Sequence, residues 1–81
     1  MKAADLTKAA LIADAREKNV AIRDRLAAGE RLTMSLGDGA AVHSIVLMPA
    51  YVARIRADLI AAFDARIGEN DQALADLGIT P

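Results

Sequence analysis

The chain has 81 residues, and its ten basic and eleven acidic side chains leave a formal net charge of −1. Because both signs are interspersed, the charge gives no electrostatic case for nucleic acid or an anionic membrane surface as a partner. There is no cysteine to form a disulfide or a thiolate metal site, and no apolar run approaches the ~20 residues that a membrane span requires.

The first predicted element is a helix over residues 5–28, with Asp5 as its N-cap and Gly29 as its C-terminal stop. One apolar stripe at helical spacing is expected to face the core, and it consists of Leu11, Ile12, Ala15, Ile22 and Leu26. A second, weaker stripe lies roughly opposite and consists of Leu6, Ala9, Ala13, Val20 and Ala27. Since the core of a monomer needs one stripe, the second is either exposed alanine-rich surface or a contact between subunits.

The next predicted element is a β-hairpin over residues 31–47. The dipeptide Asp38-Gly39 lies between two alternating runs, which predicts a type I′ turn with positive φ at both residues. The register that follows from this turn pairs Gly37 with Ala40, Leu36 with Ala41, Met34 with His43 and Leu32 with Ile45.

One face of this predicted hairpin is apolar and the other is mostly polar. The apolar face consists of Leu32, Met34, Leu36, Ala41, His43, Ile45 and Leu47. The opposite face consists of Thr33, Ser35, Ser44 and Val46. Because a two-stranded ribbon is only marginally stable alone, we expect the apolar face to pack against the helices.

The last predicted elements are a helix over residues 49–67 and a C-terminal segment over residues 69–81. Pro49 suits the first helical position, and Gly68 is expected to interrupt the helix. The segment beyond it either bends or forms a short third helix to Leu77, and residues 78–81 are expected to form a frayed tail. Apolar residues at a spacing of three or four mark the core-facing side: Val52, Ile55, Leu59, Phe63, Ile67, Leu74 and Leu77.

These elements predict one α+β domain over residues 1–81, in the order helix–β-hairpin–helix. Two long helices are expected to pack with a two-stranded antiparallel ribbon, and a short C-terminal helix is left as an open alternative. The residues expected to be largely buried lie on the facing sides of these three elements: Leu26, Leu32, Ile45, Leu59 and Phe63.

The sequence carries no set of residues typical of catalysis. His43 is the one histidine, and it has no acidic neighbour in sequence, so a packed or interface-facing side chain is favoured over a ligand or a catalyst. The stretch Leu36-Gly-Asp-Gly39 lacks the Gly-Lys-Ser/Thr ending of a phosphate loop. We therefore expect a protein that is not an enzyme and has neither a cofactor nor a metal site.

Basic residues gather toward the end of the first helix and along the second. They are Lys18, Arg23, Arg25 and Arg31 on the first side, and Arg54, Arg56 and Arg66 on the second. One interpretation is a solvated surface with ion pairs at helical spacing. The other is a basic strip that contacts phosphate or an acidic partner.

Four features between the predicted helices have a characteristic order and spacing: Gly29, Arg31, the Asp38-Gly39 turn and Val42. Their order and spacing, without gaps, resemble the head–tail joining protein W (gpW) family of tailed phages, in which a glycine and a basic residue end the first helix before a strand, a tight turn, a returning strand and a second helix. The resemblance covers roughly residues 11–67. The acidic C-terminal segment, the apolar second strand and the Met-Pro start of the second helix depart from the family pattern.

The resemblance implies a virion structural protein of the head–tail connector, assembled in the host cytoplasm. Such proteins add to the portal after DNA packaging, form a ring of identical subunits and create the surface on which the next connector or tail-completion protein docks. A passing contact with packaged DNA is left open, and no membrane partner is expected. The alternative class is a small inhibitor or regulatory protein-binding module that offers the hairpin edge for strand addition.

Under the connector interpretation, the interface residues lie on the second stripe of the first helix, at the hairpin turn and in the C-terminal segment. They are Leu6, Ala9, Ala13, Val20, Arg23, Gly37, Asp38, Gly39, Leu74, Leu77 and Ile79.

Overall fold

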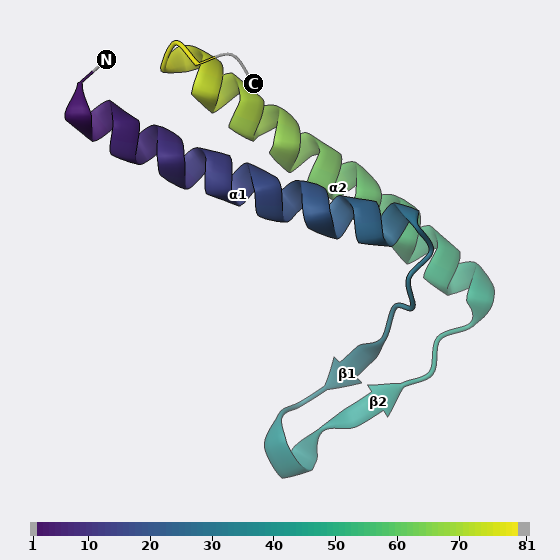
Figure 1. Cartoon of the computed structure of the whole chain (residues 1–81). Helices are drawn as coiled ribbons and strands as arrows, with labels where there is room; N and C mark the ends of the chain where they lie inside the picture. The colour runs from purple at the N-terminus through teal and green to yellow at the C-terminus, as the bar shows by residue number, and fades with distance from the viewer. Residues whose placement is uncertain (1, 80–81) are drawn as a thin grey trace.

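A computed structural model describes residues 2–79 and shows two long helices joined by a β-hairpin (Figure 1). The elements in chain order are α1 (Ala3–Ala27), β1 (Met34–Leu36), the short 3-10 helix η1 (Gly39–Ala41), β2 (His43–Ile45) and α2 (Pro49–Asp76). The two strands pair antiparallel. The predicted α+β class and the order helix–hairpin–helix are therefore confirmed.

The two helices pack side by side and antiparallel, so that the start of α1 and the end of α2 lie at the same end of the molecule (Figure 1). Seven of the eight α1 residues that are buried or half-buried recur at a spacing that alternates between four and three: Asp5, Ala9, Ile12, Arg16, Asn19, Arg23 and Leu26. The eighth is Val20, next to Asn19. This alternation is typical of two helices that pack at a shallow angle. We call these residues and their partners on α2 the helix seam.

The helix seam runs between the two stripes predicted for the first helix. It takes Ile12 and Leu26 from one stripe and Ala9 from the other, and it leaves Leu11 and Ile22 exposed. The prediction that one stripe faces the core is therefore wrong. The reason is that polar side chains of α1 pair with polar side chains of α2, and this moves the contact away from the most apolar side of α1.

Both helices end in the same glycine-dependent cap. Gly29 and Gly78 have φ values of +82° and +84°. The N–H of the residue that follows each glycine donates to a carbonyl five residues earlier, from Glu30 to Arg25 at 3.2 Å and from Ile79 to Leu74 at 2.9 Å. This is the Schellman arrangement. The predicted stop at Gly29 is confirmed.

The C-terminal segment is more regular than predicted. α2 continues without interruption through Gly68 to Asp76, so there is neither a bend nor a separate third helix. A glycine inside a helix costs about 1 kcal/mol, and α2 packs along α1 on both sides of it, which offsets this cost. Gly78 and Ile79 form the helix cap rather than a frayed tail, whereas Thr80 and Pro81 lie outside the described residues.

The hairpin has a longer loop than the sequence predicts. The register pairs Met34 with Ile45, Ser35 with Ser44 and Leu36 with His43, so the predicted pairing is displaced by two residues. Asp38 is extended, with a φ of −143°, so the type I′ turn is wrong, although Gly39 does have a positive φ. A displacement by two keeps the side chains of β1 and β2 on their predicted faces.

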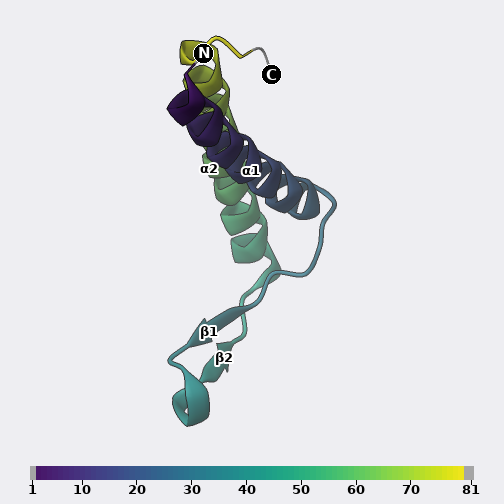
Figure 2. The same ribbon diagram turned by 60° about the vertical axis from the view of Figure 1, so that its left-hand side comes forward.

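The hairpin extends away from the helix pair, as both ribbon views show (Figures 1 and 2). Its apolar residues Met34, Leu36 and Ile45 are exposed, so the prediction that helices cover this face is wrong. Of the five residues expected in the core, Leu26 is buried, Ile45 is exposed and the other three are half-buried: Leu32, Leu59 and Phe63.

The molecule is long and thin for its chain length. Its extents are 50 × 29 × 15 Å and its radius of gyration is 16.9 Å, compared with about 12 Å for a compact domain of this length. Its accessible surface of 6089 Å² exceeds by about 1,400 Å² the ~4,700 Å² expected of a compact monomer of this size. This uncovered surface includes large hydrophobic side chains, among them Leu11, Leu36, Val46 and Met48.

Candidate interaction surfaces

Polar contacts across the middle of the helix seam join α1 and α2. Asn19 Nδ2 donates to Asn70 Oδ1 at 3.0 Å, and on either side Arg16 pairs with Asp71 and Arg23 with Asp64. These contacts are partly buried or lie at the edge of the seam. The pairing of Arg23 favours the interpretation of this part of the basic cluster as ion-paired surface.

Arg56 of α2 donates hydrogen bonds to backbone carbonyl groups at the C-terminal end of α1. Its guanidinium donates from Nη1 to the Leu26 carbonyl at 2.8 Å and from Nη2 to the Glu30 carbonyl at 2.7 Å. The last carbonyls of a helix have no partner within the helix, and a cation is favourable there because of the helix dipole. Arg56 therefore holds the end of α1 and the start of the hairpin against α2.

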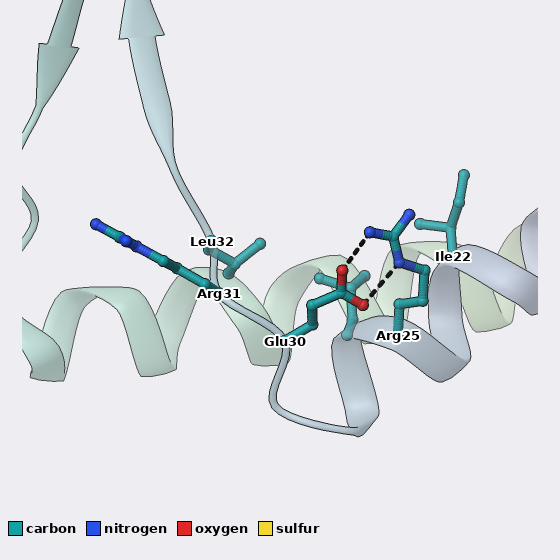
Figure 3. A pocket seen from close by; sticks show the side chains of 6 residues that line it. Ile22, Arg25, Glu30, Arg31 and Leu32 are labelled. Atoms are coloured by element: carbon teal, nitrogen blue, oxygen red, sulfur yellow. Dashed lines mark hydrogen bonds and ion pairs between the residues drawn. The ribbon is translucent and has the colours of Figure 1, made fainter.

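Beside this contact, Arg25 and Glu30 form a two-pronged ion pair (Figure 3). The hydrogen bond from the Arg25 side chain lowers the pKa of the Glu30 carboxyl below its ordinary value, and the bond to Glu30 raises the pKa of Arg25. In the Schellman cap of α1, these are the two positions that usually carry a hydrophobic contact. The ion pair takes the place of that contact.

A small apolar hollow lies between the end of α1 and the base of the hairpin (Figure 3). Its volume is about 140 Å³, and it is lined by Ile22, Leu26 and Leu32 with the ion pair and Arg31 at its rim. Cofactor and drug-sized ligand sites enclose about 300–1,000 Å³, so this hollow is too small for such a molecule. It has room for one aliphatic side chain.

The residues predicted for an interface fall into several distinct environments. Ala9 and Leu74 are buried in the helix seam, at 6% and 4% exposure, so they offer no free surface to a partner. Arg23 is half-buried and ion-paired within the chain. Val20, Leu77 and Ile79 are half-buried, whereas the remaining five are exposed: Leu6, Ala13, Gly37, Asp38 and Gly39.

Most of the exposed large hydrophobic side chains lie on the hairpin and at the start of α2. Val46, Met48 and Leu36 are 96%, 77% and 66% exposed, and Met34, Val42, Ile45 and Tyr51 are also exposed. Periodicity did not single out Val46 and Met48, because one lies on the predicted polar face and the other lies in the connection to α2. The signal that could have found them is charge, since residues 32–48 contain one charged side chain, Asp38.

His43 lies on β2, opposite Leu36, and is exposed. Among residues 2–79, no group of three or more His, Asp or Glu side chains has an arrangement that could hold a metal ion. Within the same described part of the chain, neither long helix is apolar enough to cross a membrane.

Comparisons of the chain with protein-family models, with curated proteins and with solved structures give no match.

Proposed function

We propose that the chain is a structural protein of the head–tail connector of a tailed phage or a phage-derived particle. The observation that carries this proposal is the long helix–hairpin–helix shape with a large uncovered apolar hairpin. The element order agrees with the gpW resemblance of the sequence. Extensive uncovered apolar surface suits a small protein that acts by assembly, because monomeric soluble proteins rarely expose large apolar patches.

In this proposal the protein joins a ring of identical subunits that binds the portal protein and forms the docking surface for the next neck or tail protein. It acts in the virion without a catalytic step or a cofactor. The exposed hairpin loop around Asp38 and the C-terminal residues Leu77 and Ile79 are the surfaces assigned to the adjoining ring. The exposed flank of α1 that carries Leu6 and Ala13 is assigned to the portal or to a neighbouring subunit.

A second class of function is supported by the free edges of the hairpin. The sheet has two strands, so each strand has one edge on which another extended chain could pair. A small inhibitor or regulatory binding module would use such an edge. The genes that flank this one distinguish the two classes: portal, terminase or capsid genes support the connector, and a repressor or defence locus supports the regulator.

The connector proposal is tested by changing the exposed flank of α1. Ala13→Glu places a charge on this flank and keeps the helix, because glutamate is a good helix former. We expect a folded variant that fails to restore tail joining to portal-bearing particles, since an unpaired carboxylate at an interface costs several kcal/mol. Ala61→Glu, at an exposed position of α2, is the matched control and should retain activity. Full activity of a folded Ala13→Glu protein would remove this flank from the interface.

A further inference from the structure

Two apolar surfaces of the chain are left without a partner, and they are complementary in kind. The first is the hairpin face, defined here as Met34, Leu36 and Ile45. The second is the outer stripe of α1, defined as Leu11, Ala15 and Ile22, which share one side of the helix next to the helix seam. Leu36 and Leu11 are among the most exposed large hydrophobic side chains of the described residues, at 66% and 68%.

The hairpin lacks the charged edges and the covered face that are typical of a solvent-exposed two-stranded sheet. Exposed edge strands are normally protected by charged side chains or proline, yet Asp38 in the loop is the one charge between Leu32 and Met48. An antiparallel sheet that faces water on one side normally covers its other side. The apolar face and the unprotected edges together indicate a hairpin that is covered in the working state of the protein.

The amount of uncovered surface fits two contacts on each subunit. The excess of about 1,400 Å² over a compact monomer is close to twice the ~800 Å² that each partner buries in a standard interface. A symmetric pairing of hairpin on hairpin would cover the hairpin face and leave the outer stripe exposed. A head-to-tail contact covers both surfaces on every subunit.

We propose that the hairpin face of one copy of this chain packs on the outer stripe of α1 of the next copy. The hollow beside Ile22, with its volume of about 140 Å³, receives one aliphatic side chain of the neighbouring hairpin. Lys8 borders the outer stripe and is exposed, and its charge is opposite to that of Asp38 in the incoming loop. Lys18 borders the stripe on the other side, where it pairs with Asp14 at 3.0 Å. Because the two surfaces differ, the contact repeats from copy to copy and either closes as a ring or continues as a filament.

This inference deepens the proposed connector function, and its closed-ring form rests on that function. The contact itself is a property of the isolated protein. It differs from the arrangement expected from the sequence, in which the same hairpin face packs on the helices of its own chain.

The test uses cysteine cross-linking, which is clean because the chain contains no cysteine. Leu36→Cys and Ile22→Cys proteins are mixed and oxidised, and we expect a disulfide-linked pair that contains one copy of each variant, identified by mass spectrometry. The matched control mixes Leu36→Cys with Ala61→Cys, whose cysteine is exposed on the outer side of α2, and should give much less of the mixed pair. Light scattering of the unmodified protein should show a mass that increases with concentration.

Three results would overturn the inference. The first is a yield of the mixed pair no higher than that of the control. The second is a disulfide within a single chain when both cysteines are placed in one dilute protein, because the hairpin would then fold onto its own helix. The third is a protein that stays monomeric at every concentration. Tail joining by a protein that gives these results would leave the connector proposal in place, whereas a confirmed contact in a protein without portal binding would reject the connector alone.

Discussion

At the tip of the hairpin, Gly37 adopts a φ of +84°, and a side-chain Cβ there would lie 2.6 Å from the Ala41 carbonyl oxygen. No other residue type fits this position without moving the backbone of η1. Gly39 also has a positive φ, of +53°, but it has open space around it. The tight position of the loop is therefore Gly37, outside the Asp-Gly pair that marks the turn in the sequence.

Replacing Gly37 with alanine should unfold the hairpin and spare the helices. The left-handed φ alone costs about 1–2 kcal/mol for an L-residue, and the contact with the Ala41 oxygen adds to it. We expect faster amide hydrogen exchange in β1 and β2, measured by NMR, with little change in the melting of the helices. Gly39→Ala serves as the control because it meets the φ cost without the contact. Equal protection of the strands in both variants would contradict the role assigned to Gly37.

Glu30 makes the cap of α1 sensitive to acid. Its pKa is lowered in the folded protein by the hydrogen bond from Arg25, so the ionised form favours the folded state. This contribution is present above the ordinary pKa of a glutamate and is lost as the pH falls from that value through the lowered one.

We expect the end of α1 and the base of the hairpin to loosen in this acid range, seen as chemical-shift changes at Gly29 and Arg31. Glu30→Gln should remove this transition, because the amide does not titrate. An unchanged transition in the Glu30→Gln protein would assign it to another carboxyl group.

Among the elements, the sequence predicts what depends on local chemistry. The order of the elements, the first helix, its stop at Gly29 and the two faces of the hairpin follow from glycine, proline and periodicity. The register and the helix seam do not. The displaced register comes with a loop in which the Ala41 carbonyl lies too close to Gly37 for a side chain, and the seam depends on which polar side chains meet across two helices. The register and the seam both depend on contacts between residues far apart in the sequence, which a local sequence pattern does not predict.

The same limit applies to the candidate surfaces. Ala9 and Leu74 are apolar, as residues of an interface often are, but they are buried against the opposite helix. The exposed Val46 and Met48 were missed because they follow no periodic pattern, although the lack of charge around them was visible in the sequence.

The Asn19–Asn70 pair gives a prediction about the helix seam. Asn19→Leu leaves the partly buried amide of Asn70 without its partner and should lower the free energy of unfolding by about 1 kcal/mol. The double variant Asn19→Leu, Asn70→Leu should recover this loss, because removing both partners leaves nothing unpaired. Urea unfolding followed by circular dichroism measures both. A double variant as unstable as the sum of its single variants would show that the two amides do not interact.

On the scale of the whole molecule, the paired strands of the hairpin stand apart from the helix pair, and the base of the hairpin is held against α2 by Arg56. The hairpin stands apart from the helices (Figure 2), and the contacts between α1 and α2 run along the helices themselves. Stability of the helix pair should therefore depend little on the hairpin.

Replacing residues 33–46 with a flexible Gly-Ser linker tests this independence. We expect the helix pair to fold with a melting temperature close to that of the full chain, because no seam contact is removed. The same variant should lose the self-association expected of the full protein. Loss of helical signal at ambient temperature would instead show that the hairpin contributes to the core. A variant that carries the residues of 33–46 in shuffled order closes a loop of the same length, and it therefore controls for the entropic cost of loop closure.

The charge pattern of the helix seam has a consequence for which helices can meet in a crowded assembly. The α1 side presents Arg16 and Arg23, and the α2 side presents Asp64 and Asp71. If two α1 helices from different copies met along this side, arginine would face arginine, and two α2 helices would bring aspartates together. The seam thus discriminates against partners of its own kind. Copies gathered at high local concentration keep their helices correctly matched within each chain.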